Sequence, residues 1–239
     1  MSEDKQLITD PVLSAKQNHK YLSAFGMVWV SFLIMAVYTA SKTFTLFGID
    51  YSVSIIAYPI TYIFADIFTE VYGYRVTRKV VWTGFVCLIF TAILGYVYSI
   101  VPPSSSFTED SAFRFIFQAG PIIVGSILCS FFAGELTNSL VLAKLKIFTK
   151  GKFQELRYIL STLFGQLVDN TIFFTSLYLF TNFFTSDQTV EIIISSVLFC
   201  TLVEMLMIPV TTKVIKYIKK KEGIDTYDQG TNFNPFALR

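Results

Sequence analysis

The sequence predicts an all-α integral membrane protein, a bundle of six transmembrane helices. Three observations predict this class: an apolar composition, an aromatic-rich composition and six long apolar segments. Hydrophobic residues occupy 53% of the 239 positions and charged residues only 15%, whereas a soluble domain carries about 25% charged residues. The mean hydropathy is +0.57. The 25 Phe and 13 Tyr residues suit helices whose ends lie at membrane–water boundaries.

Each predicted span holds about 20 largely apolar residues, the length that a helix needs to cross a bilayer. The six segments cover approximately residues 21–40, 51–72, 80–101, 118–143, 158–183 and 190–212. The second segment is the least continuous, because Pro59 interrupts it and Asp66 and Glu70 lie in its second half. We therefore expect one transmembrane domain of six helices over residues 21–212, between a polar segment, 1–20, and a basic tail, 213–239.

The distribution of lysine and arginine predicts the orientation, since basic residues collect on the cytoplasmic side of a membrane protein. Of the 19 basic residues, Lys42 and Arg114 fall on one side of the predicted bundle and the other 17 fall on the opposite side. Both termini are therefore expected in the cytoplasm. The run from Lys219 to Lys221 also resembles a patch for nucleic acid or anionic lipid. Topogenic charge is the simpler interpretation, and we expect the lipid bilayer, but no nucleic acid, as a partner.

Four carboxylates lie inside these apolar segments, where an ionisable group costs about 2.5–3.5 kcal/mol at a helix centre. They are Asp66, Glu135, Asp169 and Glu204. In the second, fourth and sixth spans the acidic residue lies nine positions before the first cytoplasmic basic residue, about 13 Å at the helical rise. Asp169 follows Arg157 by twelve positions, about 18 Å by the same rise. We therefore expect four helices to converge on one polar layer near the midplane.

Polar and aromatic side chains share the helix faces of these carboxylates, since residues three or four apart lie on one side of a helix. They are Tyr62 and Glu70 around Asp66, Asn138 beside Glu135, and Gln166, Asn170 and Phe173 around Asp169. Lipid-facing positions do not carry such stripes, so we expect these faces to point into the bundle. Single polar groups can also act only as interhelical hydrogen bonds worth about 0.6 kcal/mol each. Glu70 can instead pair with Arg75 or Arg78.

Several other kinds of site are not expected. His19, the one histidine, lies in the polar N-terminal segment, and all three cysteines lie in apolar segments, where we expect them to be free and buried. The chain has no phosphate-binding loop and no nucleophile elbow. We therefore expect no metal ion, no cofactor and no ATP-binding module of its own. A small-residue face formed by Gly125, Cys129 and Ala133 suits close helix contact. Whether two copies form a homodimer is left open by the sequence.

Two stretches resemble the queuosine precursor transporter family, integral membrane proteins once grouped as vitamin-uptake-like. The first is ADIFTEVYGY at 65–74, followed by three basic residues, and the second is STLFGQLVDNTIFF at 161–174. The length and the six-span layout are similar as well, over residues 21 to about 221. The resemblance implies a bacterial inner-membrane protein that takes up a 7-deazaguanine for tRNA modification. Implied cargoes are 7-cyano-7-deazaguanine, its 7-aminomethyl analogue and queuine.

The chemistry of such a cargo suits the predicted layer. A guanine-like ring presents N1–H beside an exocyclic amine, a donor pair that one carboxylate can accept. The candidates are Asp169 or Glu204 for this pair, Gln166, Asn170 or Asn138 for the O6 edge, and Asp66 or Glu135 for an aminomethyl cation. Phe173, Tyr58 or Tyr62 could stack on the purine face, worth about 1–3 kcal/mol by analogy with nucleic-acid bases.

Of three other interpretations, the first stays open, and we do not expect an enzyme. The chain could be the substrate-binding subunit of a vitamin-type uptake system that needs a separate ATP-driven module. An intramembrane enzyme would need an aspartyl pair such as Asp66 with Asp169, although neither residue lies in a catalytic motif. A purely structural scaffold would explain the topology but not four carboxylates at one depth. Facilitated, proton-coupled and potential-driven transport are equally compatible with the sequence.

Overall fold

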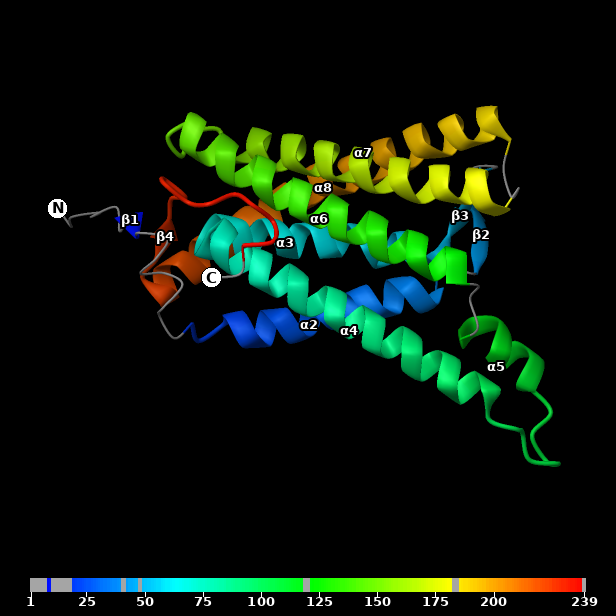
Figure 1. Ribbon diagram of the computed structural model, residues 1–239. Helices are drawn as coiled ribbons and strands as arrows, with labels where there is room; N and C mark the ends of the chain where they lie inside the picture. The colour runs from blue at the N-terminus through cyan, green and yellow to red at the C-terminus, as the bar shows by residue number, and fades with distance from the viewer. Residues whose placement is uncertain are drawn as a thin grey trace.

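The computed structural model describes residues 8–9, 19–39, 42–46, 49–117, 121–181 and 185–237. Long helices run side by side in an elongated bundle (Figure 1). Their bounds are α2 (Leu22–Thr39), α3 (Tyr58–Tyr72), α4 (Tyr74–Ile100), α6 (Pro121–Phe148), α7 (Gln154–Thr181) and α8 (Ser186–Glu222). Each lies where the sequence predicts a span, so the predicted helical membrane architecture is confirmed.

Five of the described helices are long and apolar enough to cross a membrane. They are α2, α3 together with the short 3-10 turn η1 (Val53–Ile56), α4, α6 and α8. The helix α7 is as long as α6, at 28 residues, but is not among the five. Its polar stripe of Gln166, Asp169 and Asn170 lowers its hydropathy. A six-span count therefore stays a prediction, although α7 packs closely along α6 and α8.

The core of the bundle is α3. Twelve of its 15 residues are buried, and it contacts α2, α4, α6 and α8. Trp29 of α2 covers one side of it: the buried indole donates its Nε1–H to the Thr61 carbonyl oxygen at 3.1 Å and packs against Phe68 and Phe131. Only 17–22% of the residues in the apolar windows of α2, α4 and α8 are buried in the single chain, as expected of helices that face lipid.

One residue, Gly73, separates α3 from α4. Its φ of +83° lies in the region that favours glycine, and an added Cβ would meet Thr226 Cγ2 at 2.6 Å. The sequence predicts that the third span begins near residue 80, and this boundary is wrong. Because Gly73 makes the whole turn, α4 already begins at Tyr74.

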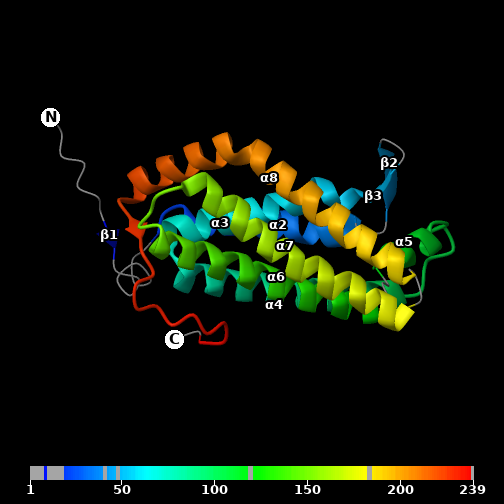
Figure 2. The same ribbon diagram turned by 90° about the horizontal axis from the view of Figure 1, so that it is seen from above.

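The end of the bundle that carries most basic residues holds both the start of α2 and the end of α8. The Tyr21 N–H donates to Glu222 Oε1 there at 2.9 Å. From a capping box at Thr185, α8 runs through Pro209 to Glu222, past the predicted end at 212, and Figure 2 shows it as an arch. We call this the basic end; its assignment to the cytoplasm stays a prediction.

Beyond Gly223 the chain turns back over the basic end. The strand β4 (Asp225–Thr226) pairs in parallel with β1 (Ile8–Thr9), and the following residues run along α4 (Figure 1). We call residues 224–237 the C-terminal strap. The basic tail expected at 213–239 is therefore partly the last turns of α8 and partly this strap.

Small elements cover the opposite end. The strands β2 (Thr43–Leu46) and β3 (Ile49–Ser52) form an antiparallel hairpin, whose Tyr51 ring lies 5.4 Å from the ring of Phe199 in α8. The short helix α5 (Asp110–Phe117) contains an Arg114–Asp110 ion pair of 2.6 Å. Neither element is predicted from the sequence, since both are short and lie in the connections between the predicted spans.

The predicted small-residue face does not make a close contact within the chain. An added Cβ at Gly125 would meet no atom within 4 Å, and Cys129 is exposed. This prediction is wrong for a single copy, and a homodimer stays a prediction. All three cysteines are free, but only Cys200 is buried. A close approach occurs instead at Gly84 of α4, which packs against the Trp29 ring.

Substitution of Gly84 by Ala should therefore destabilise the bundle. The new Cβ would lie 2.5 Å from Trp29 Cζ3, and an indole held by its hydrogen bond to Thr61 has little room to move. We expect a loss of about 1–3 kcal/mol, typical of overpacking, seen as a lower midpoint of thermal unfolding in detergent. Gly26→Ala is the matched control, because nothing lies within 4 Å of its added Cβ. Equal midpoints for the two variants would contradict this account.

Candidate functional site

The structure brings the four predicted carboxylates together inside the bundle. Asp66 of α3, Glu135 of α6, Asp169 of α7 and Glu204 of α8 are each at most 3% exposed. Asp66 lies within electrostatic range of Glu204 and Glu135, and Glu135 lies within range of Asp169. The four helices thus share one set of acidic groups, which we call the carboxylate layer.

Two tyrosines of α3 hold Asp169. The Tyr58 hydroxyl donates a short hydrogen bond to Asp169 Oδ2, and the Tyr62 hydroxyl donates to the same oxygen at 3.4 Å. The tyrosines are one helical turn apart, with ring centroids separated by 5.8 Å. Ser130 of α6 lies beside the carboxylate, while its hydroxyl donates to the Ile127 carbonyl oxygen at 3.2 Å. Asp169 therefore joins α3 to α7 and is the best-paired member of the layer.

Asp66 has one partner, Asn138 of α6, whose Nδ2 donates to Asp66 Oδ1 at 2.9 Å. This bond fixes the orientation of the amide and leaves its Oδ1 atom free to accept. In α7 the Asn170 side chain donates to Gln166 Oε1 at 2.8 Å, which in the same way leaves Gln166 Nε2 free to donate. The amides are thus held by their neighbours with one polar atom each to spare.

Seven buried polar atoms of this region have no hydrogen-bond partner among the described residues. They are Asp66 Oδ2, Asn138 Oδ1, Gln166 Nε2 and both carboxyl oxygens of Glu135 and of Glu204. The Thr61 hydroxyl faces Glu135 but donates to the Tyr58 carbonyl oxygen at 2.7 Å. A buried polar group without a partner costs about 1–3 kcal/mol and is rare in folded proteins. Six of these atoms are carboxyl or amide oxygens that can accept a hydrogen bond and one is an amide nitrogen that can donate, so a polar ligand could satisfy them.

Two glycines set the spacing of the layer. A Cβ added to Gly134 of α6 would lie 2.6 Å from both Asp169 Cβ and the Tyr62 hydroxyl, and one added to Gly165 of α7 would lie 2.8 Å from Asn138 Cβ. Hence α6 and α7 cross at these positions with Tyr62 against both backbones. This crossing is not among the features predicted from the sequence. The signal for it is that each glycine directly precedes a polar residue of the site, Glu135 or Gln166.

Glu70, one turn beyond Asp66, lies in a separate ion cluster at the basic end. Its carboxylate accepts from Arg157 Nη1 and Lys219 Nζ, each at 2.8 Å, with Lys146 Nζ at 3.4 Å. Lys146 and Lys219 also contact Asp225 of the strap, at 2.7 and 2.8 Å. These five residues form what we call the ion cluster.

The predicted pairing of Glu70 with Arg75 or Arg78 is therefore wrong. Because Gly73 reverses the chain, α4 carries both arginines away from Glu70. The Arg78 guanidinium donates instead to the carbonyl oxygens of Asn232 and Asn234 in the strap.

Phe173 is not joined to the carboxylates by any contact among the described residues. It is half-buried, and its ring packs edge-on against Phe174 at 5.1 Å. A stacking role for it, or for Tyr58 and Tyr62, stays a prediction. No group of three His, Cys, Asp or Glu residues in the described part of the chain could hold a metal ion.

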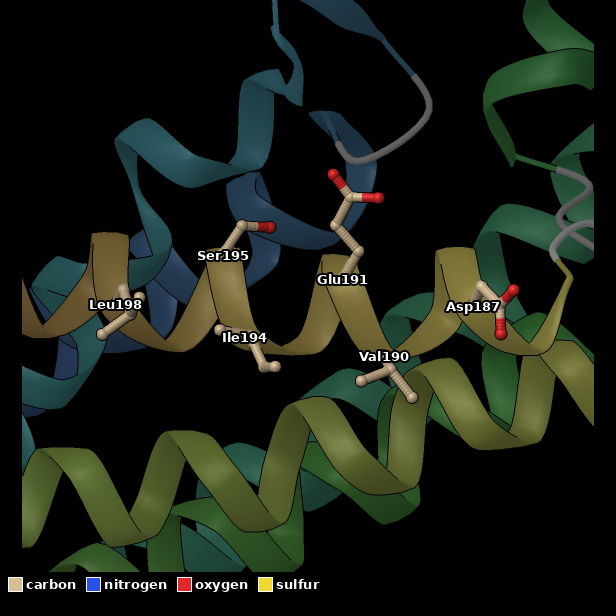
Figure 3. Close-up of a pocket in the computed structure, with 6 residues that line it drawn as sticks. All are labelled: Asp187, Val190, Glu191, Ile194, Ser195 and Leu198. Carbon is tan, nitrogen blue, oxygen red and sulfur yellow. The ribbon is translucent and has the colours of Figure 1, made fainter.

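A surface groove lies on α8 (Figure 3), and none of the four layer carboxylates lines it. It is lined by Asp187, Val190, Glu191, Ile194, Ser195 and Leu198, none of which the sequence predicts as a site residue. Its apolar side chains are more than half exposed, on a helix that is apolar enough to face lipid. We therefore assign the candidate site to the buried layer and not to this groove.

Breaking the ion cluster should destabilise the protein far more than breaking a surface pair. Glu70→Gln would leave the buried Arg157 guanidinium without its anion, a change that typically costs about 3–5 kcal/mol. Asp110→Asn removes the exposed pair with Arg114, worth about 0–1 kcal/mol. The free energies of unfolding of both variants in detergent would test this difference. A Glu70→Gln protein as stable as Asp110→Asn would show that the cluster contributes little.

Comparison with known proteins identifies the family of the chain. Residues 52–214 match a family described as "Putative vitamin uptake transporter", and that range contains all the predicted site residues. A Bacillus subtilis (strain 168) protein described as "Probable queuosine precursor transporter" is 29% identical over 197 residues, which cover 82% of this chain and 85% of the relative. No solved structure matches. The family match spans more than half of the chain, so this multi-pass membrane protein belongs to the vitamin uptake transporter family, and its resemblance to queuosine precursor transporters is confirmed.

Proposed function

We propose that this transporter imports a 7-deazaguanine base and binds it in the carboxylate layer. The observation that carries the proposal is the set of seven buried polar atoms without partners among the described residues. Six of them accept hydrogen bonds and one donates. A ligand that completes this set must be rich in donors and must present at least one acceptor.

A guanine-like edge has this pattern. Its N1–H and exocyclic amine are adjacent donors that a single carboxylate can accept, and its O6 needs a donor. Glu204 and Glu135 are the best acceptors, because both of their oxygens are unpartnered among the described residues. Gln166 Nε2 is the matching donor for O6. Asp169, which the sequence favoured for the donor pair, is already held by two tyrosines, so we assign it to positioning them.

The charges of the layer support a neutral or cationic cargo. The predicted spans that carry the carboxylates contain no lysine or arginine between residues 51 and 72, 118 and 143, 158 and 183, or 190 and 212. The nearest cations, in the ion cluster, are already paired with Glu70 and Asp225. A phosphorylated nucleotide would meet uncompensated acidic groups, whereas the ammonium of a 7-aminomethyl cargo would be attracted to Asp66 or Glu135. Glu70 is then part of the closed basic end and not a cargo contact.

We also propose that α7 completes six spans and that the basic end faces the cytoplasm of a bacterial cell. The polar stripe of α7 is covered by α3 and α6, so this helix needs less hydropathy than one that faces lipid. The 17 basic residues on one side satisfy the positive-inside rule. Cargo would then enter from the end covered by the β2–β3 hairpin and leave at the basic end.

Uptake of each labelled 7-deazaguanine, in cells that cannot synthesise it, would test the cargo. With this protein as the only addition, we expect at least one of 7-cyano-7-deazaguanine, 7-aminomethyl-7-deazaguanine and queuine to accumulate above the vector control. Failure with all three would contradict the proposal. Uptake that appears only when an ATPase module is supplied would instead identify the chain as the binding subunit of a larger system.

Neutralising Glu204 should impair uptake specifically. Glu204→Gln keeps the size of the side chain but replaces one acceptor oxygen with a donor amide. Loss of a hydrogen bond to a charged group costs about 1.5–3 kcal/mol. Because about 1.4 kcal/mol changes an affinity tenfold, we expect the cargo concentration for half-maximal uptake to rise at least tenfold. The matched control is Glu191→Gln, on the same helix but exposed in the groove of Figure 3. Equal uptake by the two variants, at equal amounts in the membrane, would remove Glu204 from the binding scheme.

A further inference from the structure

The C-terminal strap is fastened along α4 by polar contacts. Asp228 Oδ2 accepts from the Tyr74 N–H at 2.9 Å and so caps the first turn of α4. Arg78 donates to two strap carbonyl oxygens, at 2.8 and 2.5 Å. The Trp82 Nε1–H donates to the Pro235 carbonyl oxygen at 2.9 Å. Three successive turns of α4 therefore hold the strap against the bundle.

Aromatic contacts seat the last part of the strap between α4 and α6. The Phe236 ring lies 6.0 Å from that of Trp82 and 6.3 Å from that of Phe132 in α6. Phe233 packs on Tyr74 with a centroid separation of 5.3 Å. These contacts hold the apolar end of the strap against α4 and α6, while Phe236 itself stays 68% exposed.

The ion cluster fastens the beginning of the strap to the helices of the site. Glu70 comes from α3, Lys146 from α6, Arg157 from α7 and Lys219 from α8, and Asp225 of the strap bridges Lys146 and Lys219. These are the same four helices that supply the carboxylate layer. Glu70 lies one helical turn from Asp66 on the same face of α3. A cargo that left the layer toward the basic end would therefore have to separate the members of this cluster.

The opposite end has no comparable fastening among the described residues. The one ion pair found there joins Arg114 to Asp110 within α5. Tyr58, on that side of Asp169, is partly exposed, and the hairpin contacts α8 through the rings of Tyr51 and Phe199. The two ends of the site are thus closed by different means, and ionic closure is confined to the basic end.

We propose that the C-terminal strap and the ion cluster form the inner gate of the transporter. The inference rests on the proposed carrier function with the basic end inward. Ion pairs and carbonyl hydrogen bonds suit a gate that opens into water, because the separated groups are rehydrated. Lys219 and Asp225 already reach the surface, at 19% and 29% exposure. Release of the strap would break the contacts of Asp225 with Lys146 and Lys219, so that the four helices of the site could separate at the basic end. Renewed binding of the strap would close this end again after the cargo has left.

Cys200 gives a reporter of opening that does not depend on the identity of the cargo. It is buried, lies on α8, and is within electrostatic range of Asp169 and Tyr58. After replacement of Cys87 and Cys129 by Ser, it is the single thiol of the chain. A membrane-impermeant thiol reagent applied to inside-out or right-side-out vesicles then measures access to the site from each end.

Weakening the gate should expose this thiol from the basic end alone. For Asp225→Asn combined with Asp228→Asn we expect labelling of Cys200 from that face to rise about tenfold, the change that about 1.4 kcal/mol of closing free energy produces. Labelling from the other face should not change. Asp110→Asn, the matched control, should label as slowly as the parent. Unchanged labelling of the double variant, or an equal rise from both faces, would overturn the gate.

A tether tests the same gate by holding the strap closed with a covalent link in place of the contacts of Trp82 and Phe236. Trp82→Cys and Phe236→Cys, placed in a chain without its three natural cysteines, can be joined by a cleavable bifunctional thiol reagent. We expect the linked protein to retain cargo binding but to lose uptake, and cleavage of the link to restore it. Uptake by the linked protein at the unlinked rate would overturn the gate. Absence of uptake before linking would count against the proposed cargo, and the Cys200 labelling would still decide the gate.

Discussion

The close crossing of α6 and α7 at Gly134 and Gly165 is the constraint on which the site depends. A methyl group at either position would lie within 3 Å of side-chain atoms of Tyr62 and of Asp169 or Asn138, so these backbones approach more closely than a larger residue at either position would allow. The spacing of the polar groups is consequently fixed by main chain and not by the reach of flexible side chains. Small residues provide this kind of contact inside membranes, where no hydrophobic force drives helices together.

The two buried acids of α3, Glu70 and Asp66, have opposite surroundings. Glu70 is surrounded by three cations, whereas Asp66, one turn away, has one amide partner. Glu135 and Glu204 have none among the described residues. The desolvation of Glu70 is thus offset within the folded chain. The desolvation cost of the layer carboxylates must be offset by protonation or by a bound ligand. Glu70 is therefore a structural charge, whereas Asp66, on the same face of α3, is available to a ligand.

The sequence was sufficient to place the helices and the polar residues, because apolar length and helical spacing are local properties. The carboxylates of α3, α6, α7 and α8 could be found in this way, as could Asn138 and Gln166. The partners of Glu70 could not be found in this way. A lysine near the end of a span has the same sequence pattern whether it faces water or, like Lys146, pairs with a buried acid. The position of the strap could not be predicted from the sequence either. The strap binds to Arg78 and Trp82, and these lie on the first turns of α4 only because the single-residue turn at Gly73 starts that helix before the expected boundary.

That turn also places the tail against the core. Only Gly73 lies between α3 and α4, and its φ of +83° lets one residue make the turn. The carboxylate oxygens of Asp228 lie 3.2 Å from the place where a Cβ of Gly73 would be, against the positive end of the α4 dipole. A side chain of the C-terminal strap therefore contacts the turn that joins α4 to α3, the helix that carries Tyr58, Tyr62 and Asp66.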